Sequence, residues 1–202
     1  MLKRILIIIS AFYFSLLSLS QNIEKYDYTI DMKYYKAYYN KDIKTSSFVI
    51  YKLYRGGGNV SRSNLSFRTY DNFPHFNYSK SGYDKGHLVP AKDFSKSFDM
   101  LRSTFYYINC IPQNPTLNRG KWKSYEEMIR QISYSDSLLI ICGGCDYDGE
   151  IPLNCFKIVY SLTTHKCIFT LLFPNDISNT VIIDNKLKQK MTFNKSYKLY
   201  SK

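Results

Sequence analysis

Short apolar runs separated by loop-forming residues dominate the chain, and this pattern is typical of a strand-rich protein. Most runs are too short for a buried helix, and glycine, proline or a polar cluster ends each of them. The predicted strands cover residues 48–54, 104–112 and 137–144, and residues 154–173 predict a hairpin that turns at Thr163–His165. The segments 55–64, with three consecutive glycines, and 65–83 are predicted to be irregular.

One segment follows a helical period instead. Residues 118–132 (NRGKWKSYEEMIRQI) place Asn118, Trp122, Glu126 and Arg130 four residues apart, so their side chains follow one face of the predicted helix. In the alternative interpretation Trp122 packs inward, Asn118 caps the helix, and Glu126 and Arg130 form an ordinary surface ion pair. Strands with one helix and no internal linker predict a single α+β domain over residues 21–202.

The N-terminus has the layout of a secretory signal peptide. Lys3 and Arg4 precede an apolar run from Ile5 to about Leu17, and small residues follow it before Gln21. We expect residues 1–20 to be removed and the protein to be secreted or periplasmic, with no stable membrane association after cleavage. A retained membrane anchor is the alternative, although the run is short for a spanning helix.

The net charge of the chain indicates which classes of molecule it could bind. Lys and Arg number 28 against 16 Asp and Glu, a net charge of +12 that falls to +10 without Lys3 and Arg4. Such a balance favours polyanions, which include nucleic acid, anionic membranes and polysaccharides. The 20 Tyr and 13 Phe could stack on bases, but a core and sheet rich in aromatic residues explains most of them.

The five cysteines of an exported chain suggest disulfides, but their number is odd. In the predicted hairpin Cys167 faces Tyr160 or Ser161, which disfavours a bridge to Cys155. The CGGC run at 142–145 could be a redox pair or half a zinc site, but no second Cys/His pair at ligand spacing follows it. We favour buried or locally bridged cysteines.

Residues 81–94 (SGYDKGHLVPAKDF) hold one of only three histidines, His87, in a charged segment that resembles a turn. Hydrolysis of a phosphodiester needs a base, a hard cation and basic groups that hold phosphate. His87 suits the base near neutral pH, and Asn118 offers an amide oxygen to Mg²⁺. Glu126 could hold the cation's waters, and Lys85 and Arg130 could contact phosphate.

These residues also carry a family resemblance. DKGHLVPAKDF resembles the Asp-Arg-Gly-His motif of the DNA/RNA non-specific endonucleases, the ββα-metal or His-Me finger family. TFYYINCIPQNPTLNRGKWKSYEEMIR (104–130) resembles the block that follows in that family, in which Asn, Trp, Glu and Arg recur on a helix. The similarity covers about residues 48–173 and is most specific over 80–130. It implies an α+β ββα-metal nuclease fold with a mostly antiparallel central sheet and a metal-site helix near Asn118.

The resemblance implies a role for each matching residue. His87 would be the general base, Asn118 the direct ligand of Mg²⁺ (or of Mn²⁺ or another divalent cation), and Glu126 the holder of its water shell. Asn109 would orient the site, and Arg130 would contact phosphate or the transition state. Substrate-binding candidates are Lys85, Arg62 and Arg119, with Arg68 competing for the place of Arg62. Asp84 is expected to support the loop rather than act in catalysis.

The expected function is therefore that of a secreted, Mg²⁺-dependent, sugar-non-specific endonuclease that acts on DNA and RNA and leaves 5′-phosphate ends. One departure from the family is Lys85, because lysine keeps the charge of the usual arginine but loses its bidentate fork. A catalytically weak, basic, nucleic-acid-binding exported protein is the main alternative. A phosphodiesterase for another anionic substrate is a third. A homodimer and a protein inhibitor are further partners that the sequence leaves open.

Overall fold

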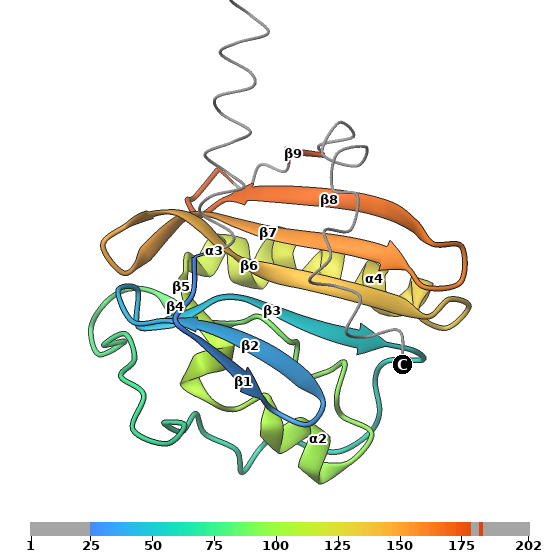
Figure 1. The fold of residues 1–202 in the computed structure, drawn as a ribbon, viewed down its shortest axis with the longest axis horizontal. Coiled ribbons are helices and arrows are strands. Elements are labelled where there is room, and N and C mark those ends of the chain that lie inside the picture. Colours follow the sequence, from blue (N-terminus) through green and yellow to red (C-terminus); the bar gives the residue numbers. More distant parts are fainter. Residues whose placement is uncertain (1–24, 179–181, 184–202) are drawn as a thin grey trace, which may run out of the picture.

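The computed structural model describes residues 25–178 and 182–183, and Figure 1 shows their arrangement. A seven-stranded sheet in the order β1-β2-β3-β6-β7-β8-β9 forms the body of the protein, and every neighbouring pair in it is antiparallel. Its strands are β1 (Tyr28–Asp31), β2 (Tyr35–Asn40), β3 (Thr45–Leu53), β6 (Leu138–Asp148), β7 (Ile151–Ser161), β8 (Lys166–Pro174) and β9 (Ile182–Ile183).

A second, two-stranded sheet and the helices lie on one side of the large sheet (Figure 1). Strand β4 (Asp84–His87) pairs antiparallel with β5 (Cys110–Gln113), and the chain then enters the helical segment directly. Two strands followed by a helix, beside a mostly antiparallel sheet, confirm the predicted α+β class. The helical elements are α2 (Phe98–Ser103), η1 (Tyr107–Asn109), α3 (Pro115–Leu117), η2 (Asn118–Trp122) and α4 (Lys123–Ile132).

The larger hydrophobic core lies between the large sheet and the helical side. Trp122 is 1% exposed and meets the ring of Phe173 on β8 edge to face, with ring centroids 5.3 Å apart. Tyr125 meets the same ring from one turn further along the helix. A smaller apolar cluster, centred on Phe48, Ile141 and Phe156, lies on the opposite face of the sheet. Period-two alternation sends neighbouring side chains of these strands to different clusters.

The predicted helix 118–132 is present but is not one regular helix. Residues Asn118–Trp122 form a π-helical turn, and Gly120 has φ −101° and ψ −111°, outside the helical region. A π-turn inserts an extra residue, so side chains four apart no longer share one face across it. Trp122 points into the core, as in the alternative interpretation, whereas Glu126 and Arg130, on the regular helix α4, are partly exposed and line a cleft.

Two local predictions were wrong. The segment 104–112 is not one strand, because Tyr107–Asn109 form a 3-10 turn and only Cys110–Gln113 are extended. The apparent turn around His87 contains strand β4, in which His87 lies opposite Cys110. Asp, Lys and Gly are poor strand formers, so pairing with β5 overrides local preference here.

The hairpin prediction is confirmed. Strands β7 and β8 pair with Tyr160 opposite Cys167, as the predicted register requires. No disulfide joins any of the five cysteines, all of which lie in the described part of the chain, and Cys142 and Cys145 belong to different apolar clusters on the two faces of β6. Burial raises the pKa of the Cys142 thiol to about 11, so the CGGC run is structural in this fold.

The predicted signal peptide, residues 1–20, lies outside the described residues. Among the residues that the structure does describe, no helix has the length and apolar character needed to cross a membrane.

Removing the Trp122 indole should test how much the helix depends on its anchor. We expect Trp122→Ala to lower the free energy of unfolding by about 3–5 kcal/mol, because it empties a large core site. Trp122→Phe should lose clearly less. The matched control is Met128→Ala on the exposed side of α4, where Met128 is 39% exposed and the expected change is within about 0.5 kcal/mol. Urea unfolding of the three variants measures the difference, and equal losses for Trp122→Ala and Met128→Ala would contradict this packing.

Candidate functional site

An open cleft of about 1380 Å³ lies where β4 meets the helical segment. Its walls come from the irregular segment 60–83, from β4 and from the helix that begins at Asn118. Seven of the predicted site residues line it together, namely Arg62, Lys85, His87, Asn118, Arg119, Glu126 and Arg130. The topology therefore gathers side chains that are up to 68 positions apart into one space.

Strand β4 places His87 at the cleft. The imidazole packs between Phe67 and Phe105, with ring centroids 4.8 Å and 5.1 Å away, and its Nε2 is buried without a hydrogen-bond partner. Burial, with the positive charge of Arg62 as the second cause, lowers the pKa of His87 to about 3. The ring is therefore neutral at all pH values well above 3, and the same burial makes it a weaker proton acceptor than a solvated imidazole.

Asp84, at the start of β4, fixes the Asn118 side chain. The amide Nδ2 of Asn118 donates to Asp84 Oδ2 at 2.9 Å. Because a carboxylate can only accept, the nitrogen must face Asp84 and the amide oxygen must turn away from it. Arg119 donates to both oxygens of the same carboxylate at 2.8 Å and 2.6 Å, and this contact, followed by that of Asn118, lowers the pKa of Asp84. Asp84 is thus an ionised support for the Asn118 amide.

Asn109 lies behind the cleft rather than in it. Its side chain is fully buried, accepts from the Val89 N–H at 2.9 Å, and donates to the carbonyls of Val89 and Thr104. Its own carbonyl accepts from the Leu88 N–H at 2.9 Å. Asn109 therefore holds the backbone that immediately follows His87, which agrees with an orienting role and places it outside direct contact with a bound molecule.

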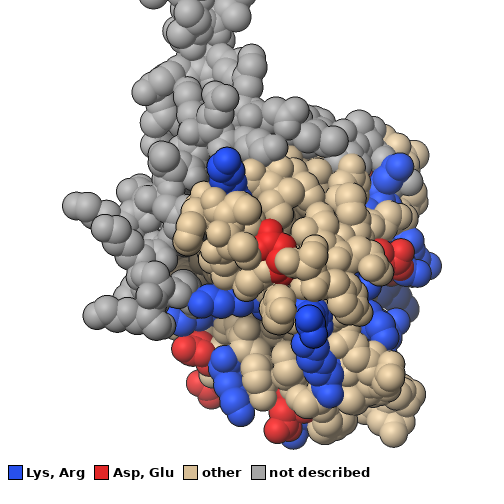
Figure 2. Space-filling model, turned by 90° about the vertical axis from the view of Figure 1, so that its right-hand side faces the viewer, with Lys and Arg blue, Asp and Glu red and all other residues tan. Residues whose placement is uncertain are grey.

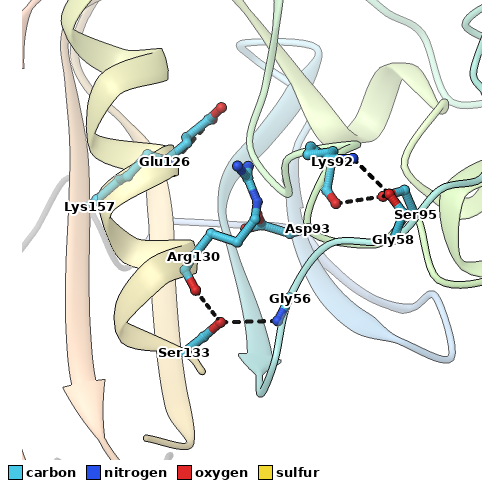
Figure 3. A network of polar contacts seen from close by, with 9 residues as sticks. All are labelled: Gly56, Gly58, Lys92, Asp93, Ser95, Glu126, Arg130, Ser133 and Lys157. Carbon is cyan, nitrogen blue, oxygen red and sulfur yellow. Dashed lines mark hydrogen bonds and ion pairs between the residues drawn. The ribbon is translucent and has the colours of Figure 1, made fainter. Parts of the chain in front are cut away.

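Glu126 and Arg130 point from α4 toward the cleft, and Figure 3 shows their side chains directed to the same side of the helix. The Glu126 side chain is only 15% exposed, and its Oε1 has no hydrogen-bond partner. Burial raises its pKa to about 7, although the positive charge of Lys157 opposes the shift. The carboxyl group is therefore balanced between its two protonation states near neutral pH.

Lys157 lies beneath this pair and is a site residue that the sequence did not reveal. It is fully buried on β7, with Nζ 3.8 Å from the centroid of the Trp122 ring and 3.6 Å from Glu126 Oε1. Cys142 Sγ accepts a hydrogen bond from the same ammonium at 3.4 Å. A buried lysine needs such partners, because an unpaired charge in the interior is costly. The alternation of β7 could have placed Lys157 on the inner face, but nothing local names Glu126 as its partner.

Asp93 is a second supporting residue that sequence reasoning missed. Its carboxylate accepts from Arg130 Nε at 2.7 Å, and the Asp93 and Arg130 side chains are 1% and 12% exposed. Burial raises the pKa of Asp93 to about 6, against the effect of Arg130. Asp93 holds one edge of the guanidinium and leaves the remainder of that group at the cleft wall (Figure 3).

The two arginines before β4 that are candidates for binding phosphate lie in different places relative to the cleft. Arg62 is exposed, lines the cleft and is close enough to affect the titration of His87. The guanidinium carbon of Arg68 instead lies 4.3 Å from the centroid of the Tyr106 ring, and Arg68 is not among the residues that line the cleft. The geometry therefore favours Arg62 over Arg68 as a contact for a bound anion.

The residues at the cleft suit a hard divalent cation. Among the described residues there is no cluster of three or more His, Cys, Asp or Glu side chains of the kind that encloses zinc. The Asn118 amide oxygen, which faces away from Asp84, and the Glu126 carboxylate, whose Oε1 is ion-paired with Lys157, are instead the kind of oxygen donors that Mg²⁺ accepts, since it keeps several waters. The donor set therefore fits a cation bound through one direct protein ligand.

Basic side chains spread over the surface. Figure 2 shows Lys and Arg side chains around one face of the molecule, with acidic side chains between them rather than one continuous basic patch. On this face, therefore, the basic side chains do not form a single continuous patch.

Comparison with known proteins identifies relatives of this chain. A 30% identical relative is a nuclease from Nostoc sp. strain PCC 7120, aligned over 61% of this chain and 46% of the relative. Endonuclease G of Bos taurus is 32% identical over 45% of this chain and 31% of its own length. The chain thus spans less than half the length of these relatives.

A solved structure of an EndoG/EndoGI complex, which describes how EndoG is inhibited, has the same fold. It superposes with a TM-score of 0.68 over 83% of this chain and 82% of that chain, at 20% identity. The model of the DNA/RNA non-specific endonucleases matches residues 15–200, which include the whole cleft and nearly the whole chain. The chain belongs to the DNA/RNA non-specific endonuclease family.

Proposed function

We propose that this protein is a Mg²⁺-dependent, sugar-non-specific endonuclease that hydrolyses phosphodiester bonds in DNA and RNA. His87 on strand β4, and Asn118 and Glu126 on the helical segment, line the same cleft, and this observation carries the proposal. Asp84 joins the strand to the helical segment through its hydrogen bond with Asn118. Membership of the family and the nuclease relatives support the same reaction class.

Each residue has a distinct task in this reaction. The neutral His87 imidazole accepts a proton from the attacking water, which makes it the general base. Asn118 would hold the cation directly and Glu126 would hold it through water, whereas Arg130, Lys85 and Arg62 bind the phosphate oxygens. When bound, such a cation would neutralise the charge that develops on the phosphate and on the leaving oxygen. Arg119 acts mainly by holding Asp84, because its guanidinium is already engaged there.

The biological setting belongs to the same proposal. A signal peptide at residues 1–20 would export the enzyme, either as a secreted or as a periplasmic protein. The structural neighbour is a complex between EndoG and its inhibitor EndoGI, which supports an inhibitor partner for this chain as well. A homodimer remains a prediction.

Digestion of plasmid DNA and of RNA in the presence of Mg²⁺ tests the central step. We expect cleavage of both, loss of cleavage with EDTA, and a rate about 100-fold to 10,000-fold lower for His87→Ala, because the general base is gone. The matched control is His165→Asn. His165 is exposed in the β7–β8 turn at φ 55°, a conformation that asparagine tolerates, so full activity is expected.

The outcomes separate the alternatives. Binding of nucleic acid without cleavage by the intact protein would favour the catalytically weak binder. Hydrolysis of small phosphodiesters but not of nucleic acid would favour a different anionic substrate. Cleavage by His87→Ala at the rate of the intact protein would refute His87 as the base.

The titration of Glu126 should determine how kcat/KM depends on pH at limiting Mg²⁺. The ionised carboxylate holds the waters of a cation more strongly than the protonated acid does, because it is charged and accepts hydrogen bonds with both oxygens, and its pKa of about 7 makes that form dominant above pH 7. His87 has a pKa of about 3 and stays neutral over the whole range, so it contributes no limb there. We therefore expect kcat/KM to rise with pH through about pH 7, and this limb should be absent in Glu126→Gln.

Lys157→Met provides the sharper test of that assignment. Lys157 lowers the pKa of Glu126, so its removal should move the acidic limb of kcat/KM to higher pH. Lys166→Met, at an exposed position on β8, is the control and should leave the limb in place. Profiles from about pH 5 to about pH 9, with thermal unfolding of each variant to confirm folding, decide the point. An unchanged limb in a folded Lys157→Met protein contradicts the coupling between Lys157 and Glu126.

A further inference from the structure

Aromatic rings form part of the lining of the cleft. Phe67, His75, Tyr78 and Tyr107 all line the cleft, and they are set around Tyr107. The His75 ring lies parallel to the Tyr107 ring, with centroids 3.7 Å apart and planes 13° apart. Phe67 and Tyr78 are also stacked on Tyr107, at 5.7 Å and 6.0 Å. We call these four side chains the aromatic wall.

The aromatic wall is held rigidly, although three of its members come from the irregular segment 65–83. His75 Nδ1 lies 2.9 Å from the Phe76 carbonyl oxygen, and because a carbonyl only accepts, Nδ1 must carry the proton. The carbonyl of Pro74, one residue earlier, accepts from the buried Tyr39 hydroxyl at 2.8 Å. A ring whose orientation is fixed before binding loses little freedom when a ligand stacks on it.

One end of this stack is available to a ligand. Tyr107 covers one face of the His75 ring, and no other ring contacts His75 among the described residues. His75 is partly exposed and lines the cleft. Core packing alone does not account for an ordered imidazole at the open end of a stack, because an interior ring is enclosed on both faces.

The aromatic wall lies next to His87, the proposed general base. Phe67 contacts both Tyr107 and His87, so the stack and the general base share one neighbour. Lys85 Nζ lies 5.6 Å from the centroid of the Tyr107 ring and 5.9 Å from that of Tyr78, which puts a positive charge over the same rings. A planar group stacked there would have a cation close to it for an attached phosphate.

We propose that the aromatic wall is a subsite for an unpaired nucleobase, and that it directs the enzyme toward single-stranded nucleic acid. The inference rests on the proposed nuclease function. In a duplex each base already stacks on both sides inside the helix, so only an unpaired or displaced base can present a face to His75. A charged wall for phosphates opposite an aromatic wall for bases is the arrangement that binds single strands without sequence preference.

Binding of two oligomers with equal phosphate number isolates the base contribution. A single-stranded oligothymidylate and an oligomer of abasic units of the same length share the backbone electrostatics. We expect the protein to bind the oligothymidylate about 5- to 100-fold more tightly, since stacking acts on it alone. Fluorescence anisotropy in EDTA, with a gel to confirm intact oligomers, measures both affinities.

His75 variants then assign the difference to the stack. His75→Ala should remove the preference for the oligothymidylate and leave the affinity for the abasic oligomer unchanged. His75→Phe loses the hydrogen bond to the Phe76 carbonyl but keeps a ring that can stack on a base. It should therefore retain the preference for the oligothymidylate. If His75→Phe loses the preference as His75→Ala does, or if both oligomers weaken equally in His75→Ala, the subsite is refuted.

The result is distinguishable from failure of the nuclease proposal. Mg²⁺-dependent cleavage of plasmid and RNA by the intact protein, with no preference for bases over abasic units, overturns the subsite alone. Absence of both cleavage and oligomer binding overturns the proposed function and the subsite with it.

Discussion

The contact between Asp84 and Asn118 is the constraint on which the site depends. It joins the strand that carries His87 to the first residue of the helix that carries Glu126 and Arg130. Since the partner is a carboxylate, the same contact determines which atom of the Asn118 amide is available to a cation. Arg119 keeps that carboxylate ionised and in position. A cleft between separate elements thereby acquires the fixed geometry that chemistry at phosphate requires.

Glu126 and Arg130 are also held by charged partners, and these partners are buried in the interior. Lys157 is buried under the helix with its charge between Trp122 and Glu126, and Asp93 is buried behind Arg130. Each buried charge is compensated by a group that reaches the cleft, so breaking either pair would leave an isolated charge in the interior. The core anchor Trp122 and the cleft residue Glu126 are therefore coupled through one lysine. Stability and function share this part of the fold.

The sequence was informative where chemistry depends on residue type and spacing. Strands β3, β6, β7 and β8 follow from apolar runs ended by turn residues, and the Tyr160–Cys167 register follows from the turn at 163–165. His87, Asn118, Glu126 and Arg130 were selected by residue type, by their spacing and by the resemblance to the family motif, and they line one cleft. These predictions required no knowledge of which elements pack together.

The remaining features depend on tertiary contacts that no local pattern encodes. Strand β4 is made of poor strand formers and exists because β5 pairs with it. The run 104–112 breaks because Asn109 turns inward to hold the backbone after His87. The backbone at Gly120 leaves the helical region within the π-turn that precedes α4, and the partners Lys157 and Asp93 lie 31 and 37 positions from the residues they support. The surroundings of Lys85 at the cleft are the rings of Phe67, Tyr78 and Tyr107, which its neighbours in sequence do not indicate.

The most direct measurement of the central claim is the position of a divalent cation in a crystal of this protein grown with Mn²⁺, located by anomalous diffraction. The account predicts one strong peak in the cleft at coordination distance from the amide oxygen of Asn118, with Glu126 separated from it by water. A peak bound directly by Asp84, or a cleft without a cation at a Mn²⁺ concentration that supports cleavage, would contradict the account.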